Sequence, residues 1–294
     1  MPKPLVSIII PVHKTTVYLK PCIESALDQT YSKIEVIIIC NGELEIKECR
    51  EFLNIEDYRL VYCKSAKGRD NARNLGLSIA KGEYIQFLDY DDVLYSTKLT
   101  DQLIDLKKSR AAISISKWKK FSNSLDEKYF FPFNKLFVLK YTSALQIINT
   151  LGTHGGFIAT GSYLIDSNVA KASQWIDSPN DDAVYFSEIC KSNPKIVMTD
   201  KILTGYRIHQ NNTSSIVSKK DFLLLLNGWS LIENNLKFYN NKAKKKYFFK
   251  SYLYLISNSK KIGYFKIMYL VFKCIYYSAS LKEVKSVFGR IKAS

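Results

Sequence analysis

The feature that most restricts the fold of this chain is an alternation of short apolar segments with amphipathic ones over the first 117 residues. The amphipathic segments carry apolar side chains at helical spacing, as Leu19, Ile23 and Leu27 do. Gly82 follows another such stripe, where we expect it to end a helix with a positive φ. The apolar segments are predicted strands at 5–10, 35–39, 59–63, 84–88 and 111–116. The alternation predicts an α/β fold in which helices wrap a parallel sheet.

The rest of the chain is less regular and contains one candidate boundary, the polar stretch at 210–214. Strand-like segments at 195–198 and 202–208 precede this stretch. Residues 128–165 mix aromatic strand-like pieces with a glycine-rich stretch and give no clear assignment. We therefore predict one domain at 1–215, with halves at 1–117 and 118–215, and a basic aromatic helical region at 216–294.

Polar side chains follow each of the first four predicted strands. In an open α/β sheet, ligands bind outside the carboxyl ends of the strands, so these side chains are candidates for one shared site. The strands are followed, in chain order, by Pro11, Val12 and His13, by Asn41, by the segment 64–73 with Lys67 and Arg73, and by the acidic segment 89–92.

The acidic segment contains three carboxylates, Asp89, Asp91 and Asp92. Such crowding is unfavourable unless a cation neutralises it. Mg²⁺ and Mn²⁺ use one or two carboxylates and complete their shell with water and phosphate oxygens, so the ligand is expected to contain a diphosphate. The alternative is a solvated loop or helix N-cap, where Asp is also common. The position directly after a strand favours the metal site.

Two basic residues, Lys67 and Arg73, follow the third strand. They could supply positive charge to the same phosphates or contact the base, but a basic loop leading into a solvated helix is an equal alternative. Neither a Walker-type glycine-lysine loop nor a G-x-G-x-x-G is present. This weighs against P-loop ATPases and kinases and against dinucleotide enzymes, so metal and side chains are expected to hold the phosphates.

Five motifs, in this order, resemble the family 2 glycosyltransferases, which are inverting enzymes with the GT-A fold, a Rossmann-like nucleotide-binding sheet with helices on both faces. The motifs span roughly the first hundred residues and lie at Val6–His13, Ser25–Tyr31, Glu35–Gly42, Ala72–Leu77 and Gly82–Asp92. The resemblance implies that a nucleotide-sugar donor lies against Pro11, Val12, His13, Asn41, Lys67, Arg73, Asp89 and Asp91. It also implies that Mn²⁺ or Mg²⁺ lies beneath the diphosphate, with Asp91, Asp92 and His209 as metal ligands.

Two positions depart from the pattern of this family. The family usually has an aromatic residue in place of His13 and an acidic pair in place of Cys40 and Asn41. The amide oxygen of Asn41 can still accept a hydrogen bond from a pyrimidine N–H. We expect a UDP-linked donor.

The segment 180–186 resembles the acidic pair that opens the family's catalytic-base helix. Asp182 matches the base better than Asp181 does, although an ordinary helix N-terminus with an acidic first turn has the same pattern. The segment 206–209 resembles the strand and following histidine that close over the diphosphate, where a loop histidine would otherwise be solvated. The resemblance implies an in-line displacement that inverts the anomeric configuration, with Asp182 removing the acceptor proton.

The last quarter of the chain carries most of the positive charge. Residues 219–294 hold 16 Lys and Arg against 3 Asp and Glu, a net +13 out of +16 for the whole chain. The apolar stretch 262–277 is too short and too charged to span a bilayer, and its Lys266 and Lys273 share a helical face. This favours a helix lying on an anionic membrane surface and a lipid-linked acceptor. The alternative is an ordinary helical tail with a solvated charged face.

Location and partners follow from these features as expectations. No secretory signal opens the chain, and the six cysteines lack C-x-x-C spacing, which predicts a cytoplasmic protein with reduced structural thiols. We expect it on the cytoplasmic face of the inner membrane, as a peripheral protein, with either a monomer or a homo-oligomer open. Its expected role is sugar transfer to a glycan or lipid-linked acceptor in the synthesis of surface polysaccharide or lipooligosaccharide.

Two rival functions remain open from the sequence. A sugar nucleotidyltransferase also uses metal-bound acids on an α/β sheet, but it typically has a glycine-rich loop where this chain has Pro11–Thr16. A non-catalytic protein that binds RNA or membrane would explain the basic aromatic tail. It would not explain the acidic segment 89–92, because carboxylates repel nucleic-acid phosphates, so no nucleic-acid partner is expected.

Overall fold

The computed structural model describes residues 3–125, 141–209, 218–258 and 264–293. Within these ranges the strands form one eight-stranded sheet in the order β3-β2-β1-β4-β7-β6-β8-β5. The strands are β1 (Val6–Val12), β2 (Ile34–Asn41), β3 (Leu60–Ser65), β4 (Tyr84–Phe87), β5 (Val93–Leu94), β6 (Ile113–Phe121), β7 (Tyr163–Asp166) and β8 (Ile196–Arg207).

The strands predicted in the first 117 residues are confirmed to within a few residues, but the sheet is mixed rather than parallel. β1, β2, β3 and β4 are parallel, whereas β7 lies antiparallel between β4 and β6. β5 also pairs antiparallel with β8. The two strand-like segments predicted at 195–198 and 202–208 are one strand, because β8 absorbs the residues between them in register shifts against β6.

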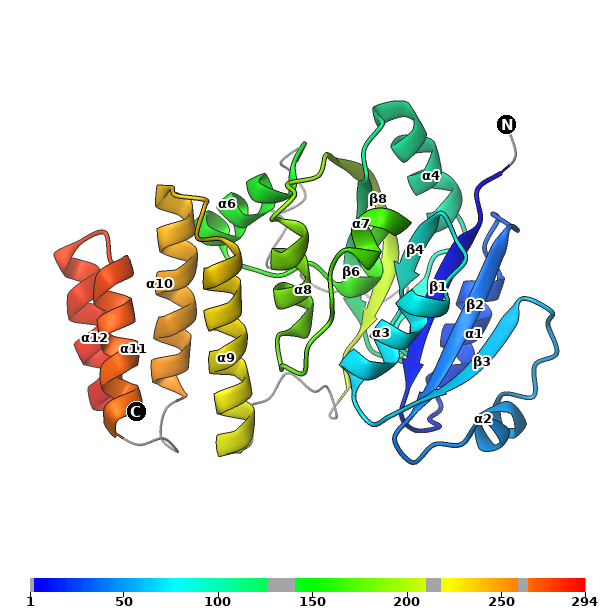
Figure 1. Cartoon of the computed structure of the whole chain (residues 1–294), viewed down its shortest axis with the longest axis horizontal. Helices are drawn as coiled ribbons and strands as arrows, with labels where there is room; N and C mark the ends of the chain where they lie inside the picture. The colour runs from blue at the N-terminus through cyan, green and yellow to red at the C-terminus, as the bar shows by residue number, and fades with distance from the viewer. Residues whose placement is uncertain (1–2, 126–140, 210–217, 259–263, 294) are drawn as a thin grey trace.

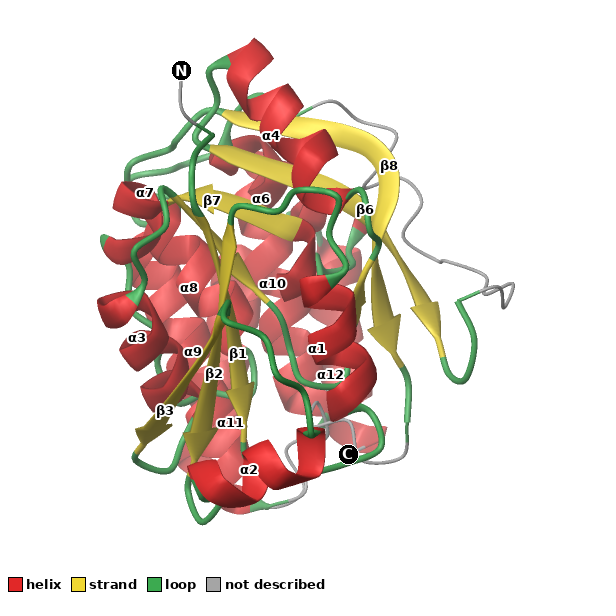
Figure 2. Cartoon of the chain, turned by 90° about the vertical axis from the view of Figure 1, so that its right-hand side faces the viewer, coloured by secondary structure: helices red, strands yellow, loops and turns green. Residues whose placement is uncertain are grey.

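Alternate residues of the central strands pack into two different cores, as the two-residue period of a β-strand requires. Ile9 and Ile37 belong to one core, whereas Ile8 and Ile38 belong to the other. Figure 2 shows α3 and α7 on one side of the strands and α1 on the other. The helices of the first face are α3 (Arg69–Ile79), α6 (Ala144–His154), α7 (Ser167–Lys171) and α8 (Asp181–Ile189), and those of the second are α1 (Leu19–Leu27), α2 (Ile46–Leu53) and α4 (Lys98–Ser109).

Gly82 does not end a helix, so that prediction was wrong. The C-cap of α3 is Ala80, with φ −59°. Gly82 is needed for a close approach to β1, because a Cβ at this position would lie 2.5 Å from the backbone nitrogen of Ser7. The Gly82 N–H donates to Ser7 Oγ at 2.8 Å instead.

Four helices follow the sheet: α9 (Lys219–Asn235), α10 (Lys242–Ser257), α11 (Tyr264–Tyr277) and α12 (Leu281–Ala293) (Figure 1). Phe222 and Phe248 share a core with Ile9 of the sheet, so α9 and α10 are packed onto the preceding domain. A Cβ at Gly152 of α6 would overlap the backbone carbonyl oxygen of Ala243 in α10. The predicted boundary at 210–215 lies outside the described residues, and the division into two domains stays a prediction.

The predicted basic face of α11 is not formed as expected. Lys273 turns inward, where its Nζ donates to both carboxylate oxygens of Glu233 in α9, at 2.7 and 2.9 Å. The exposed side of α11 is apolar instead and includes Met268, Phe272 and Tyr276. No helix of the described ranges is long and apolar enough to cross a membrane.

Candidate active site

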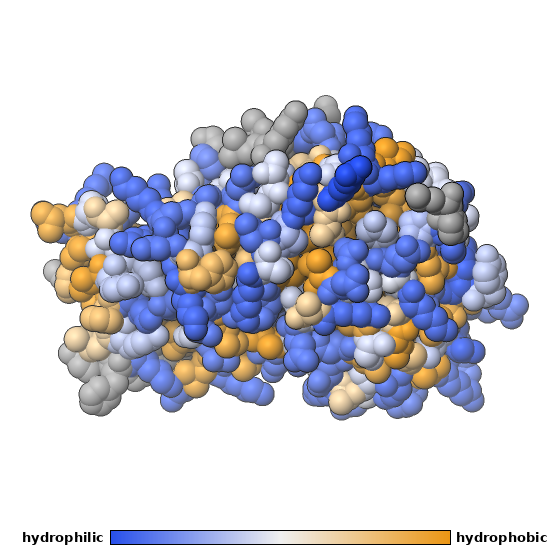
Figure 3. Space-filling view, turned by 45° about the horizontal axis from the view of Figure 1, so that its top comes forward, coloured by the Kyte–Doolittle hydropathy of each residue, from blue (hydrophilic) through white to orange (hydrophobic). Residues whose placement is uncertain are grey.

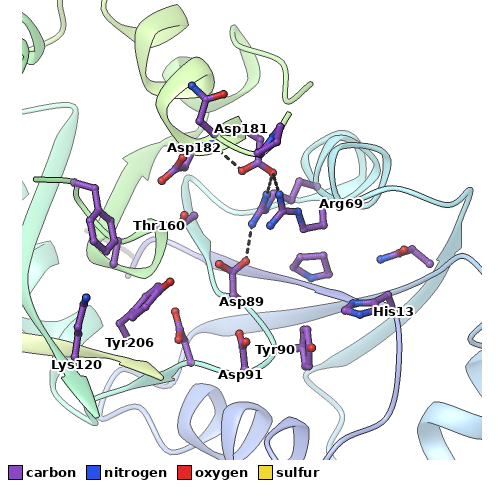
Figure 4. Close-up of a pocket in the computed structure, with 18 residues that line it drawn as sticks. His13, Arg69, Asp89, Tyr90, Asp91, Lys120, Thr160, Asp181, Asp182 and Tyr206 are labelled. Carbon is purple, nitrogen blue, oxygen red and sulfur yellow. Dashed lines mark hydrogen bonds and ion pairs between the residues drawn. The ribbon is translucent and has the colours of Figure 1, made fainter. Parts of the chain in front are cut away.

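A cavity of about 350 Å³ opens at the carboxyl ends of β1, β2 and β4 (Figure 4). Loops after these strands, the first turns of α3 and α8, and the ends of β6 and β8 surround it. Its wall is made by Pro11, His13, Asn41, Arg69, Arg73, Asp89, Tyr90, Asp91, Asp92, Lys120, Phe157, Ala159, Thr160, Pro179, Asn180, Asp181, Asp182 and Tyr206.

Most of the residues predicted to form a site lie on this cavity. They are Pro11, His13, Asn41, Arg73, Asp89, Asp91, Asp92, Asp181 and Asp182. His209 joins them through a contact of 2.8 Å between its Nε2 and Asp91 Oδ2. The structure does not bring Val12 or Lys67 to the wall: the Val12 side chain is buried in the core, and Lys67 is exposed before α3.

Several wall residues were missed by sequence reasoning. Arg69 lies four residues before Arg73 in α3, and this helical spacing was a signal that both face the same way. Lys120 lies two residues after the buried Trp118 in β6, so strand alternation puts both on one face. Phe157 gave no signal, because it lies in the stretch that the sequence left unassigned.

Arg73 connects the two acidic parts of the site. One terminal nitrogen, Nη1, donates to Asp181 Oδ2 at 2.7 Å, and the other, Nη2, donates to Asp89 Oδ1 at 2.6 Å. The guanidinium carbon lies 4.2 Å from the ring centroid of Trp175, and the side chain is only 2% exposed. Arg73 therefore fixes the start of α8 against the end of β4.

Asp182, the second residue of α8, lies beside this connection but forms no ion pair with a Lys or Arg of the described residues. Its Oδ1 accepts from the Ala183 N–H at 2.7 Å. Burial, together with the neighbouring negative charge of Asp181, raises the pKa of Asp182 to about 6. A carboxylate with a pKa near neutrality is suited to accept a proton from a bound hydroxyl.

The other acidic residues are held by the end of β8. Asp92 Oδ1 accepts from the Arg207 N–H at 2.8 Å, and the Arg207 Nε donates to the Asp91 carbonyl at 2.8 Å. The His209 ring stacks on Tyr18 with ring centroids 5.0 Å apart. Burial and the charge of nearby aspartates raise the pKa of both Asp91 and Asp92.

The donor atoms of Asp91 and His209 fit a divalent cation that takes most of its ligands from elsewhere. No group of three or more His, Cys, Asp or Glu within the described ranges forms a complete metal site. Mg²⁺ and Mn²⁺ need no such cage, since water and substrate phosphates complete their shell. Burial first, and then the charge of Asp89, raise the pKa of Asp91, and a cation here would offset both effects.

The opposite end of the cavity suits a planar, uncharged group. His13 contacts Tyr90 edge to face, with ring centroids 5.1 Å apart. Burial first, then the charges of Lys14 and Arg69, lower the pKa of His13. Asn41 is 3% exposed, and its Nδ2 has no hydrogen-bond partner in the described part of the chain. An amide with an unmet hydrogen-bonding atom at a cavity wall is typical of a ligand site.

Comparison with solved structures shows the fold. The chain superposes on a crystal structure of residues 1–349 of Staphylococcus aureus TarS in complex with UDP with a TM-score of 0.66 and 16% sequence identity. The match covers 96% of this chain and 82% of the TarS chain. The mixed sheet and its helices are therefore those of the GT-A fold.

Two curated relatives match at the level of sequence. Escherichia coli WfaP, a UDP-Glc:alpha-D-GlcNAc-diphosphoundecaprenol beta-1,3-glucosyltransferase, is 32% identical over 222 residues, which are 72% of this chain and 80% of WfaP. The glycosyltransferase GlyG of Streptococcus pneumoniae is 28% identical over 148 residues. This match covers about half of each protein, 49% in both cases.

The family model described as glycosyl transferase family 2 matches residues 7–163, which is more than half of the 294 residues. The matched range contains β2 to β6, all of β1 except Val6, and the acidic segment after β4. The sequence match agrees with the fold and with the cavity at the strand ends. The chain belongs to glycosyl transferase family 2.

Proposed function

We propose that this glycosyltransferase moves a sugar from a UDP-linked donor to a hydroxyl of a lipid-linked, diphosphate-bearing acceptor, with inversion at the anomeric carbon. The observation that carries the proposal is the position of Asp182. Its carboxylate, with a pKa of about 6, lies on the same cavity as Asp91 but on the far side of the connection made by Arg73. The proposed proton acceptor and the proposed diphosphate site would thus face one reaction space, since Figure 4 draws Asp182 and Asp91 on the wall of the same cavity.

The donor nucleotide would lie across the strand ends, with its base between His13 and Asn41 and its diphosphate beside Asp91. The TarS neighbour has the same fold and binds UDP, which supports this class of ligand. A bound Mg²⁺ or Mn²⁺, held by Asp91 and His209 with Asp92 beside them, would supply positive charge against the departing diphosphate.

In the reaction, the acceptor oxygen forms a bond to the anomeric carbon from the face opposite the diphosphate. The bond between the anomeric carbon and the diphosphate oxygen breaks, and UDP leaves with the electron pair. Asp182 takes the proton of the acceptor hydroxyl. Arg73 keeps Asp181 and Asp89 in place, so that Asp182 at the start of α8 stays aligned with the donor.

The lipid-linked acceptor is proposed because WfaP, whose name describes a diphosphoundecaprenol-linked acceptor, aligns over 72% of this chain.

We also propose that residues 1–215 form the catalytic domain and that 216–294 contact an anionic membrane. Hydrophobic residues are exposed at the end of the molecule where α11 and α12 lie (Figure 3). Phe272 is 65% exposed and Tyr276 is 64% exposed, on a helix that also carries Lys266.

Membrane contact is tested by flotation of the full chain with vesicles that contain anionic lipid. Changing both Phe272 and Tyr276 to Glu should reduce the bound fraction, because an apolar face then becomes acidic. Changing the exposed Val17 and Tyr58 to Glu, far from α11 in the sequence, is the matched control. Equal flotation of all three proteins would remove this part of the proposal.

The donor class is tested by thermal unfolding in the presence of nucleotides. UDP should raise the melting temperature more than ADP, GDP or CDP does, and Mn²⁺ should increase the effect of UDP, because a ligand bound only by the folded state stabilises it. Transfer from UDP-sugars to a diphosphate-linked sugar should accompany this stabilisation. The proposal fails if no nucleoside diphosphate stabilises the protein with or without Mn²⁺.

A further inference from the structure

Two aromatic rings and a lysine line one part of the cavity, and Figure 4 shows the lysine, Lys120, and one ring, Tyr206, at the end away from His13. We call Phe157, Tyr206 and Lys120 the aromatic subsite. The rings of Phe157 and Tyr206 meet edge to face with centroids 5.7 Å apart. Trp118, which is 2% exposed, contacts both rings; its ring centroid lies 4.7 Å from that of Phe157 and 5.6 Å from that of Tyr206.

The sheet register explains why these side chains meet. Lys120 of β6 is the direct partner of Tyr206 in β8, so both point to the same face of the sheet. Trp118 lies two residues before Lys120 and shares that face. Lys120 and Tyr206 therefore stand on paired strands, which hold side chains more precisely than a loop does, whereas Phe157 lies in the loop between α6 and β7 and packs on Trp118.

Lys120 differs from the other cations of the cavity wall. Arg69 and Arg73 both contact Asp181, at 3.4 and 2.7 Å. Lys120 Nζ instead lies 5.8 Å from the ring centroid of Phe157, and no salt bridge to a carboxylate is formed by it among the described residues. An ammonium group on a cavity wall without a carboxylate partner is suited to bind an anion that arrives with a ligand.

The position of the subsite relates it to the acceptor rather than to the nucleotide. In Figure 4, Lys120 and Tyr206 lie on the side of the cavity away from His13, and Asp182 and Thr160 lie on that same side. The proposed function puts the donor diphosphate and a divalent cation at Asp91. The Lys120 ammonium group and that cation would repel each other if both bound the same phosphate oxygens. Aromatic rings present apolar faces on which the C–H face of a sugar packs.

We propose that the aromatic subsite binds the acceptor, and that it selects a sugar esterified with phosphate or diphosphate at its anomeric oxygen. The sugar ring lies on Phe157 and Tyr206, and Lys120 binds the phosphate. This inference rests on the proposed function, because it takes the hydroxyl that reacts to be the one facing Asp182. It adds the residues that recognise the acceptor and the chemical group by which they do so.

The test uses binding to the full chain saturated with UDP and Mn²⁺, measured by titration calorimetry. The first probe is N-acetylglucosamine joined through a diphosphate to a decyl chain, and the second is the decyl glycoside of the same sugar, which has no phosphate. N-acetylglucosamine 1-phosphate is the third probe and separates recognition of the phosphate from contact with the lipid chain. The wild type should bind the diphosphate probe more tightly than the glycoside.

Lys120→Met should weaken binding of the diphosphate probe about tenfold or more and leave the glycoside unchanged, because a charged hydrogen bond is lost. Lys120→Arg should restore most of the affinity. Phe157→Ala should weaken both lipid probes to a similar extent. Lys119→Met is the matched control, since Lys119 precedes Lys120 on the opposite face of β6 and is not part of the cavity wall.

Binding of UDP, measured first in every variant, separates this inference from the proposed function. Unchanged UDP affinity with loss of the diphosphate probe in Lys120→Met supports the acceptor subsite. An equal loss of UDP affinity would assign Lys120 to the donor and overturn the inference. Wild-type protein that binds UDP but neither phosphate-bearing probe would also overturn it, whereas absence of UDP binding in the wild type contradicts the proposed function itself.

Discussion

Asp91, Asp92 and Asp182 of the cavity and Glu233 of the C-terminal helices are all at least partly buried, but their pKa values shift in opposite directions. Glu233 accepts hydrogen bonds from Lys273 at 2.7 Å, from the Tyr277 hydroxyl at 2.6 Å and from the Tyr252 hydroxyl. Burial raises the pKa of Glu233, but these donors together lower it by more, so the net shift is downward. Its negative charge is compensated within the protein, and its hydrogen bonds link α9 to α10 and α11.

The cavity has the opposite balance. Burial and mutual repulsion raise the pKa of Asp91, Asp92 and Asp182, and their protein partners offset these effects only in part. A carboxylate with too few partners weakens the fold and becomes useful only when a ligand or proton arrives. The pKa shift is therefore upward for the three acids that line the cavity and downward for the acid that links the C-terminal helices, which agrees with the proposed roles of the cavity acids.

The largest effect on transfer activity is expected for Asp182→Asn. If Asp182 is the base, the change should lower the transfer rate on the order of 10³-fold, since proton removal by a positioned base contributes about that much. The urea midpoint should stay the same or rise, because a poorly compensated charge is removed. Glu188→Gln in the same helix, where Glu188 pairs with the exposed Lys191, is the control and should keep full activity. Full activity in Asp182→Asn would contradict the base assignment.

The next largest effect is expected for Asp91→Asn. Loss of this charge should lower transfer on the order of 10²-fold, because it removes a group that would hold a divalent cation beside the proposed diphosphate. The rise in melting temperature that Mn²⁺ adds to UDP should disappear. The rise caused by UDP alone should remain, since His13 and Asn41 are unchanged. A variant that keeps the Mn²⁺ effect would show that Asp91 is not a metal ligand.

The strand ends could be predicted because they are local features of the sequence. Each apolar segment of five or six residues is followed by a polar segment, and the ends of β1, β2 and β4 do meet at one cavity. The order of the sheet could not be predicted in this way. β7 enters between β4 and β6 through Ile165, which pairs with Ile85 and Ile113, and those contacts span 80 and 52 residues of chain.

The same distinction holds for single side chains. Asp91 and His209 meet across 118 residues, so only the resemblance to a family indicated that they belong together. Lys67 and Arg69 differ by two residues, and the turn before α3 decides which of them faces the cavity. Glu233 has partners 40 and 44 residues away, and no pattern in the basic C-terminal region pointed to it.

The stabilising side of the comparison is tested by Glu233→Gln. Removing the charge should lower the free energy of unfolding by about 2 kcal/mol, because Lys273, only 20% exposed, then lacks its counter-ion. Transfer activity of the folded variant should be unchanged. Lys273→Met should be similarly destabilising, and the double variant should lose less than the sum of the two, since the residues act as a pair. Strict additivity would show that Glu233 and Lys273 are not coupled.

The smallest expected effect is a difference in pH dependence between the two regions. The folded pKa of Asp182, about 6, lies above its ordinary value of 3.8, so the folded state binds this proton more tightly than the unfolded state does. The stability contributed by protonated Asp182 is therefore present at low pH and is lost as the pH rises through 6. Glu233 has a folded pKa below its ordinary 4.5, so its stability is present above 4.5 and is lost as the pH falls further.

Activity and stability should consequently fail in different pH ranges. Between pH 7 and pH 5 the transfer rate should fall about tenfold, because a base with a pKa near 6 is then mostly protonated. Circular dichroism over the same range should show an intact fold, since Glu233 remains ionised. The residual activity of Asp182→Asn should lack this decline, and Glu233→Gln should keep it, because only the first variant removes the titrating base. A decline of the same size in Asp182→Asn would assign the pH dependence to another cavity group, with Asp91 and Asp92 next in order because their pKa values are also raised.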